Sequence, residues 1–325
     1  MGTTQRLQQA LPIAVAVAII VLAGRVLART LKHVSLAGVY AHLHAIATPQ
    51  LAIAALLVVV IYATLATYEA IIAHTVAGPV TARRAMLGAL LAASIGHVLG
   101  WGAVSGGAIR YRLYSAVLMR PLDIGKMVLL AAMPYPVGLG LLLGLSLVLQ
   151  SAAAAPILHV PPELARGTGL ALLVLHALYV TLILNRRAPL ILGRFLLTMP
   201  SPSLTAVQYC VGTIEVCCGA GILYALMPAA TAPPFLVFVG IYVLGILAGL
   251  ASSVPAGLGV FEAMLVTLLP HVPKEQLIAT VVAYRLVLEF VPAVIAITLF
   301  VGYEAWWRLP AQRARLARLE RERAG

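Results

Sequence analysis

The sequence predicts an all-α fold: a polytopic integral membrane helix bundle with about seven or eight spans and one or two re-entrant half-helices. Hydrophobic residues make up 62% of the 325 residues and charged residues only 10%, against roughly 45–50% and 25% in a soluble domain. The mean hydropathy is +1.03. A soluble domain needs a more polar surface than this, and a disordered chain contains far fewer apolar residues.

Apolar stretches long enough to approach the roughly 20 residues of a spanning helix follow one another along the chain. They cover about 10–28, 51–73, 85–104, 127–149, 169–184, 204–227, 235–252 and 275–301. A shorter stretch, 258–269, lies between Pro255 and Gly257 on one side and Pro270 and Pro273 on the other. Its twelve residues give roughly 18 Å of helix, well short of a bilayer core of about 30 Å, so it predicts a re-entrant half-helix.

The domain division follows from these stretches. Residues 1–305 are predicted to form one transmembrane domain, and residues 306–325 a basic cytosolic tail. Trp306 and Trp307 suit a membrane interface, and five arginines lie after Pro310. Basic residues near the ends of spans favour the cytosolic side, which predicts a cytosolic C-terminus.

Orientation of the N-terminal half depends on the stretch 85–104. With the C-terminus inside, the loops at 110–126 and 186–194 also lie inside. If 85–104 crosses the membrane, Arg25, Arg29 and Lys32 lie inside and Arg6, Arg83 and Arg84 outside; if it folds back, the two groups exchange. Each arrangement places three basic residues inside, so charge does not choose between them.

The formal net charge of +12 arises from basic residues between apolar stretches or at the C-terminus. This placement indicates membrane loops and an anionic lipid surface as partner, rather than nucleic acid. The three cysteines, Cys210, Cys217 and Cys218, share one apolar stretch with no zinc or disulfide spacing, and are interpreted as packing residues. No cofactor and no metal site are expected.

Five ionisable residues lie within apolar stretches: Glu69, Glu215, Glu262, Arg285 and Glu289. A charge at the bilayer centre costs at least about 2.5–3.5 kcal/mol, so such residues face a bundle interior or a wet cavity. Arg285 and Glu289 are four residues apart on one helix and can pair. They form either a structural ion pair or part of a polar pathway for a charged head group; the excess of carboxylates favours the pathway.

A second pattern is the break SSVPAGLGVFE at 252–262, where Pro255, Gly257 and Gly259 interrupt the helix and Glu262 follows. Broken backbone at membrane depth must line a cavity or be buried in protein. Unpaired N–H groups at the start of the short helix predict an anion site, as in the discontinuous helices of transporters. The alternative is a plain kink with a capping carboxylate.

A third pattern is the glycine-rich stretch 96–107, which leads into a basic segment. Ser105, Gly106, Arg110, Arg112 and Tyr114 are the candidate binding residues here. Two arginines beside tyrosines at the membrane surface suit phosphate capture, because guanidinium matches phosphate with two parallel hydrogen bonds. The alternative is ordinary anchoring by positive charge. His97 is interpreted as a packed or hydrogen-bonded histidine rather than a ligand.

These motifs resemble those of the lysylphosphatidylglycerol synthase transmembrane-region family, which includes the flippase half of the bacterial multiple peptide resistance factor. The family's P-x-G-x-G-x-x-E corresponds to Pro255, Gly257, Gly259 and Glu262, and its S-G-x-x-x-R-x-R-x-Y to Ser105, Gly106, Arg110, Arg112 and Tyr114. Its Y-R element corresponds to Tyr284 and Arg285.

The resemblance implies a flippase-like lipid translocase for phospholipid, with aminoacylated phosphatidylglycerol as candidate substrate, and a role in resistance to antimicrobial peptides. Full-length members carry a soluble synthase domain, and this sequence ends shortly after the last span. A transporter rather than an enzyme is therefore expected, with a separate synthase and a second copy of the chain as candidate partners.

In the hypothetical mechanism, Arg110 and Arg112 attract phosphate and the break at 255–259 binds near the midplane. Glu262 and Glu289 contact an amino group, while Arg285 holds phosphate or Glu289. Two alternatives stay open: an ion-coupled transporter of a small solute, and an integral-membrane lipid transferase in which the carboxylates act as general bases.

Overall fold

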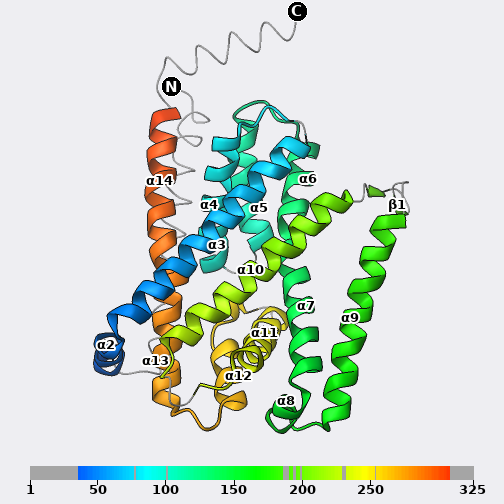
Figure 1. Ribbon diagram of the computed structural model, residues 1–325. Coiled ribbons are helices and arrows are strands. Elements are labelled where there is room, and N and C mark those ends of the chain that lie inside the picture. The colour runs from blue at the N-terminus through cyan, green and yellow to red at the C-terminus, as the bar shows by residue number, and fades with distance from the viewer. Residues whose placement is uncertain are drawn as a thin grey trace, which may run out of the picture.

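A computed structural model describes residues 36–307, except 77, 100–101, 186–189, 193–194, 198–199, 229–231 and 253. Within these residues the fold is a bundle of helices with one two-stranded hairpin (Figure 1). The all-α membrane-bundle prediction is confirmed. The predicted first span at 10–28 and the basic tail from 308 onward lie outside the described residues.

The helices and strands follow in this order. They are α2 (Leu36–Ala45), α3 (Thr48–Thr75), α4 (Ala82–Leu99), α5 (Gly102–Ser115), α6 (Pro121–Ala132), α7 (Pro134–Leu149), α8 (Ser151–Leu158), α9 (Pro162–Asn185), β1 (Leu190–Leu192), β2 (Phe195–Leu197), α10 (Pro202–Leu226), α11 (Phe235–Ala251), the 3₁₀ turn η2 (Pro255–Gly257), α12 (Val260–Leu268), α13 (Lys274–Arg285), the π-helical turn η3 (Leu286–Phe290) and α14 (Val291–Trp307).

Five helical segments of the described chain are long and apolar enough to cross a membrane. They are Thr48–Thr75, Pro121–Leu149, Pro162–Asn185, Pro202–Leu226 and Lys274–Gly302. This is fewer than the stretches expected from hydropathy in the same residues, because two of those stretches are arms of helical hairpins. Hydropathy reports the length of an apolar stretch and not whether the chain turns back after it.

The two hairpins enter the bundle from opposite faces. Helices α4 and α5 pack together between the end of α3 and the start of α6, both at the upper edge of Figure 1. Helices α11 and α12 pack together between the end of α10 and the start of α13, both at the lower edge. The stretch 85–104 therefore folds back, which resolves the alternative that charge could not decide.

The same order of elements occurs twice with opposite orientation. Helix α3, the α4–α5 hairpin and α6–α7 form one set, and α10, the α11–α12 hairpin and α13–α14 form the other. Helices α3 and α10 pack side by side and run antiparallel (Figure 1), α4 packs on α14, and α11 packs on α7. This is the arrangement of an inverted-topology repeat, in which binding sites lie near the midplane between the halves.

Both interrupted long helices are bent at a proline. Pro134 and Pro292 lack the N–H that would bond the carbonyls of Leu130 and Leu288, four residues earlier in each helix. Tyrosine hydroxyls of α3 donate to these carbonyls instead: Tyr68 to the Leu130 carbonyl at 2.8 Å and Tyr62 to the Leu288 carbonyl at 3.3 Å. Helix α3 thereby stabilises the bend in each half of the repeat.

Replacing Tyr62 by phenylalanine removes its buried hydrogen bond to the Leu288 carbonyl. We expect Tyr62→Phe to lower the free energy of unfolding by about 1 kcal/mol or more, measured as thermal unfolding in detergent. The matched control is Tyr111→Phe, because Tyr111 is 53% exposed. Equal stability of the two variants would contradict the role of the Tyr62 hydroxyl.

Candidate functional site

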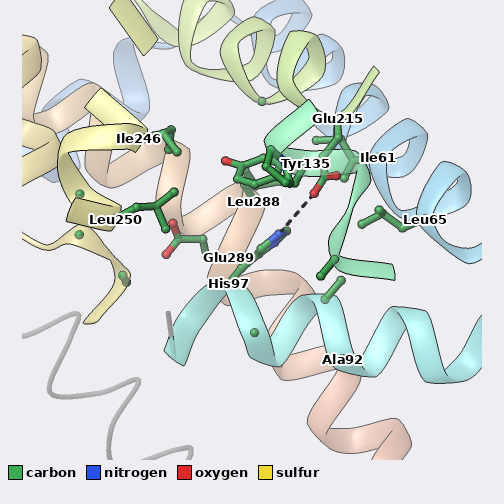
Figure 2. A pocket seen from close by; sticks show the side chains of 18 of the residues that line it. Ile61, Leu65, Ala92, His97, Tyr135, Glu215, Ile246, Leu250, Leu288 and Glu289 are labelled. Atoms are coloured by element: carbon green, nitrogen blue, oxygen red, sulfur yellow. Dashed lines mark ion pairs between the residues drawn. The ribbon is translucent and has the colours of Figure 1, made fainter. Parts of the chain in front are cut away.

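A cavity of about 610 Å³ lies between the two hairpins and is lined from α3, α4, α5, α7, α10, α11, α13 and η3, among others. Six ionisable side chains reach it: Glu69, His97, Arg110, Glu215, Arg285 and Glu289. Figure 2 shows the His97 and Glu215 side chains pointing toward one another, whereas the Glu289 carboxylate points away from them, toward Leu250. The structure thus brings residues far apart in the sequence to one polar cavity within apolar helices.

The cavity has an apolar edge formed by α11 and the residues after it. Ile246, Leu250 and Val254 line this edge, and Leu250 is 61% exposed. The cavity therefore reaches the surface beside the second hairpin. An opening with charged residues inside and aliphatic side chains at its edge suits an amphipathic ligand, because each part of the ligand meets a surface of matching polarity.

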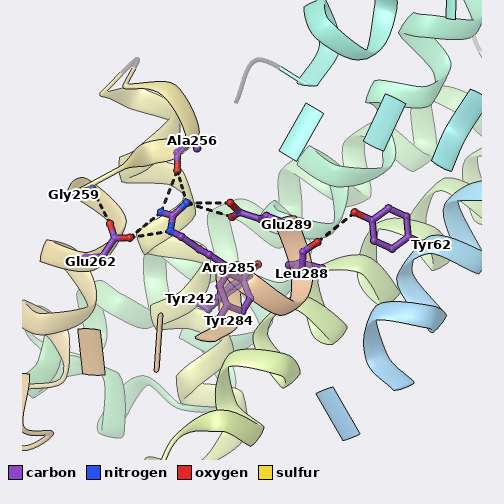
Figure 3. Close-up of polar contacts among 9 residues, drawn as sticks. All are labelled: Tyr62, Tyr242, Ala256, Gly259, Glu262, Tyr284, Arg285, Leu288 and Glu289. Atoms are coloured by element: carbon purple, nitrogen blue, oxygen red, sulfur yellow. Dashed lines mark hydrogen bonds and ion pairs between the residues drawn. The ribbon is translucent and has the colours of Figure 1, made fainter. Parts of the chain in front are cut away.

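Arg285 is the centre of the polar contacts at the second hairpin (Figure 3). Its Nε donates to Glu262 Oε1 at 3.0 Å, and its Nη1 lies 3.3 Å from both carboxylate oxygens of Glu289. The residue is only 2% exposed. The predicted pairing of Arg285 with Glu289 is confirmed, and Glu262 is a second carboxylate on the same guanidinium.

The guanidinium also supports the broken backbone. Nη1 and Nη2 of Arg285 each donate to the Ala256 carbonyl at 3.3 Å. Ala256, Gly257 and Gly259 have φ values of 54°, 60° and 81°, a left-handed conformation that favours glycine. Arg285 therefore holds the break in the second hairpin as well as two carboxylates.

Glu262 occupies the start of the short helix α12. Its Oε2 accepts from the Gly259 N–H at 2.8 Å, so the carboxylate caps the helix while its other oxygen contacts Arg285. The backbone site expected to attract an external anion is thus partly filled by a side chain of the protein. The break itself is confirmed, and Glu262 combines the capping role with the ion pair.

Aromatic rings pack beneath the guanidinium. The Arg285 Cζ lies 6.0 Å from the centroid of the Phe261 ring, close to the limit of a cation–π contact. Tyr242 and Tyr284 share a hydrogen bond of 2.8 Å between their hydroxyl oxygens. These rings restrict the positions that Arg285 can adopt toward the cavity.

Arg110 belongs to a second, separate ion pair at the first hairpin. Its Nε and Nη2 each donate to one oxygen of Glu69 at 2.7 Å, and the Tyr114 hydroxyl donates to Glu69 Oε1 at 2.9 Å. Glu69 is 1% exposed. The sequence analysis missed this partner for Glu69, although an unpaired carboxylate in an apolar helix was itself a signal that an arginine should be near.

The expectation that Arg110 and Arg112 together bind phosphate needs correction, because Arg110 forms a buried ion pair with Glu69. Ser105 and Gly106 lie within the regular helix α5 rather than in unwound chain. Gly106 allows α5 to approach α4 closely: a Cβ there would lie 3.3 Å from the Ala92 Cβ. The glycine pattern at this position serves packing within the hairpin.

Glu215 lies on α10 and lines the same cavity as the two ion-paired clusters. Its Oε1 is 3.9 Å from His97 Nε2, and the His97 Nδ1 is buried without a hydrogen-bond partner. His97 is therefore packed against the cavity, as expected, but it also faces a carboxylate. Of the cysteines on the same helix, Cys218 is buried and Cys210 exposed.

No known protein-family profile matches the sequence. The chain is 27% identical over 300 residues to the "Uncharacterized protein slr0712" of Synechocystis sp., which covers 90% of this chain and 91% of that protein. It is 26% identical over 206 residues to the "Inner membrane protein YbhN" of Escherichia coli, covering 62% of this chain and 64% of that protein.

A shorter similarity links the chain to the phosphatidylglycerol lysyltransferase of Staphylococcus epidermidis. The identity is 34% over 96 residues, which is 28% of this chain and 11% of that enzyme. The resemblance seen in the motifs is thus supported over a limited segment. The five apolar helices and the similarity to an inner membrane protein indicate that this chain is a membrane protein.

Gly257 tests the geometry of the break. A Cβ at Gly257 would lie 3.0 Å from the Gly249 Cα, whereas one at Gly259 would have nothing within 4 Å, although both residues have positive φ. We expect backbone strain in both alanine variants to lower the free energy of unfolding by about 1–2 kcal/mol. Gly257→Ala should lower it further because of the close contact. Thermal unfolding in detergent measures the change in stability, and Gly125→Ala in α6 is the control. A smaller loss of stability for Gly257→Ala than for Gly259→Ala would contradict the expected order.

The Glu69–Arg110 pair is tested by removing one charge and then both. Glu69→Gln leaves Arg110 buried without a counter-charge and should lower the free energy of unfolding, measured by thermal unfolding in detergent, by about 3–5 kcal/mol. The double variant with Arg110→Gln should recover part of this stability. Arg120→Gln is the control, because Arg120 is 81% exposed in its pair with Asp123 and such pairs contribute about 0–1 kcal/mol. Additive losses in the double variant would show that the two residues are not coupled.

Proposed function

We propose that this chain is a transporter rather than an enzyme, and that it moves phospholipid between the two leaflets of a bacterial inner membrane. The head group passes through the cavity while the acyl chains remain in the lipid. The observation that carries the proposal is the cavity between two opposed re-entrant hairpins, with ion pairs at each hairpin and an apolar opening at Leu250.

The opening separates this proposal from a transporter of small polar solutes. A solute without acyl chains gains nothing from an aliphatic edge at the surface of the bundle, whereas a lipid keeps its chains outside Ile246 and Leu250 while its head group enters. The similarity to the phosphatidylglycerol lysyltransferase points to phosphatidylglycerol or its aminoacylated form as the lipid class.

The roles of the charged residues follow from their contacts. Arg285 can exchange one of its two carboxylates for the phosphate of a head group, since guanidinium binds both in the same bidentate manner. A carboxylate released in this way, Glu262 or Glu289, can then contact an amino group on the same head group. An aminoacylated lipid satisfies both contacts at once.

Charge on the two faces supports a cytosolic upper face. The helix ends at the upper edge of Figure 1, which are the start of α4, the end of α5 and the start of α6, carry Arg83, Arg84, Arg112, Arg120, Asp123 and Lys126. The starts of α9 and α13, at the lower edge, carry Glu163, Arg166, Lys274 and Glu275. The first set is strongly basic and the second is balanced, as the positive-inside rule requires if the upper face is cytosolic. The α4–α5 hairpin then enters from the cytosol and the α11–α12 hairpin from the other side.

The test is leaflet exchange of fluorescent phosphatidylglycerol, with and without an aminoacyl group, in liposomes that contain the purified chain. Arg285→Lys keeps the charge but loses the planar fork, and Glu262→Gln loses one ion-pair partner. We expect each to slow exchange by about tenfold or more, because a charge-assisted hydrogen bond contributes about 1.5–3 kcal/mol. Arg166→Ala, at an exposed position of α9, is the control.

Three outcomes would count against the proposal. Wild-type rates in folded Arg285→Lys and Glu262→Gln proteins would remove these residues from the mechanism. Chemical conversion of the labelled lipid would indicate a transferase. Uptake of a water-soluble compound without lipid exchange would indicate a solute transporter.

A further inference from the structure

The membrane-embedded ionisable groups of the described chain do not balance in charge. Arg110 and Glu69 sum to zero, whereas Arg285 with Glu262 and Glu289 sums to one negative charge. Glu215 adds a second negative charge when it is ionised. Among the described residues, two arginines therefore accompany four carboxylates, of which Glu69, Glu215 and Glu289 line the cavity.

Of the four carboxylates, Glu215 has the weakest contact with a positively charged side chain among the described residues. The other three accept hydrogen bonds from an arginine, whereas the ion partner found for Glu215 within the described residues is His97, at 3.9 Å. The Glu215 side chain is only 11% exposed. A carboxylate in such a site is stabilised by binding a proton, because the neutral form needs far less solvation.

The groups around Glu215 come from every neighbouring part of the cavity. Tyr62 on α3, Tyr135 on α7 and Tyr242 on α11 are within electrostatic reach of its carboxylate, and all three are also within reach of Glu289. Arg285 and Tyr284 on α13 and Glu69 on α3 line the same cavity. His176 on α9 bonds Tyr209 of α10 instead. The cation nearest to Glu215 would be His97 itself, if it is protonated.

We infer that Glu215 and His97 form a proton-binding site, and that proton movement through this site drives substrate through the cavity. The proton comes from water on one face, binds Glu215 directly or by way of His97 Nε2, and leaves to water on the other face; no other bond forms or breaks. The driving role rests on the proposed lipid transport, whereas proton binding by Glu215 stands without it.

Charge balance links the proton to the lipid. A phosphate that binds Arg285 displaces a carboxylate, and the cavity then holds one more negative charge close to Glu215 and Glu289. Binding one proton removes that excess, so one anionic lipid and one proton move together without net charge. The direction of a pH gradient then sets the direction of lipid movement.

The steady-state distribution of labelled phosphatidylglycerol between leaflets tests this inference. The full chain is reconstituted in liposomes with an imposed gradient of one pH unit and a membrane potential clamped to zero. One proton per lipid predicts a leaflet ratio that shifts by up to about tenfold, because one pH unit corresponds to a factor of ten in proton activity. Glu215→Gln should return the ratio to the value without a gradient, and Glu163→Gln, exposed on α9, should not.

The outcomes separate this inference from the proposed function. Lipid exchange in the wild type with no response of the ratio to pH would overturn proton coupling and leave lipid translocation standing. Absence of exchange would overturn translocation, and proton binding is then read from the infrared carbonyl band of a protonated carboxyl group in the purified protein. If that band is the same in wild type and Glu215→Gln, Glu215 binds no proton and the inference fails.

Discussion

The cost of an uncompensated charge inside a membrane governs the arrangement of this protein. Arg285 is 2% exposed and reaches two carboxylates and one backbone carbonyl, so almost every donor of its guanidinium has a partner. Because those partners come from α12, η2 and η3, the guanidinium joins three segments that apolar packing alone would not hold in register. Arg285 thus links the second hairpin to α13 and η3.

The same constraint applies to backbone groups freed by proline and glycine. At the break in the second hairpin, Arg285 satisfies the Ala256 carbonyl and Glu262 satisfies the Gly259 N–H. At the two proline bends, Tyr62 and Tyr68 of α3 take the place of the missing N–H. Interrupted helices persist in this bundle because side chains complete their hydrogen bonds, which is the condition for irregular backbone at membrane depth.

The sequence predicted features that depend on near neighbours in the chain. The 252–262 break follows from proline and glycine, and the Arg285–Glu289 pair follows from a spacing of four on one helix. The Arg110–Glu69 pair joins residues 41 positions apart, and its formation requires α5 to fold back against α4 and α3. Hydropathy cannot distinguish a crossing helix from a returning one, so neither the first hairpin nor this pair could be derived from local patterns.

For the transport proposed above, the inverted repeat offers two equivalent ways to open the cavity, one toward each face. Helix α11 packs on α7 as α4 packs on α14, so the two halves use equivalent contacts in opposite orientation. The cavity opens at Leu250, at the end of α11, and the equivalent position in the other half is the end of α4, two residues after His97. If the halves exchanged their packing, the opening would move to α4, and the His97–Glu215 pair would lie beside it. A proton held between these residues would then meet the second face with the head group, as coupled movement requires.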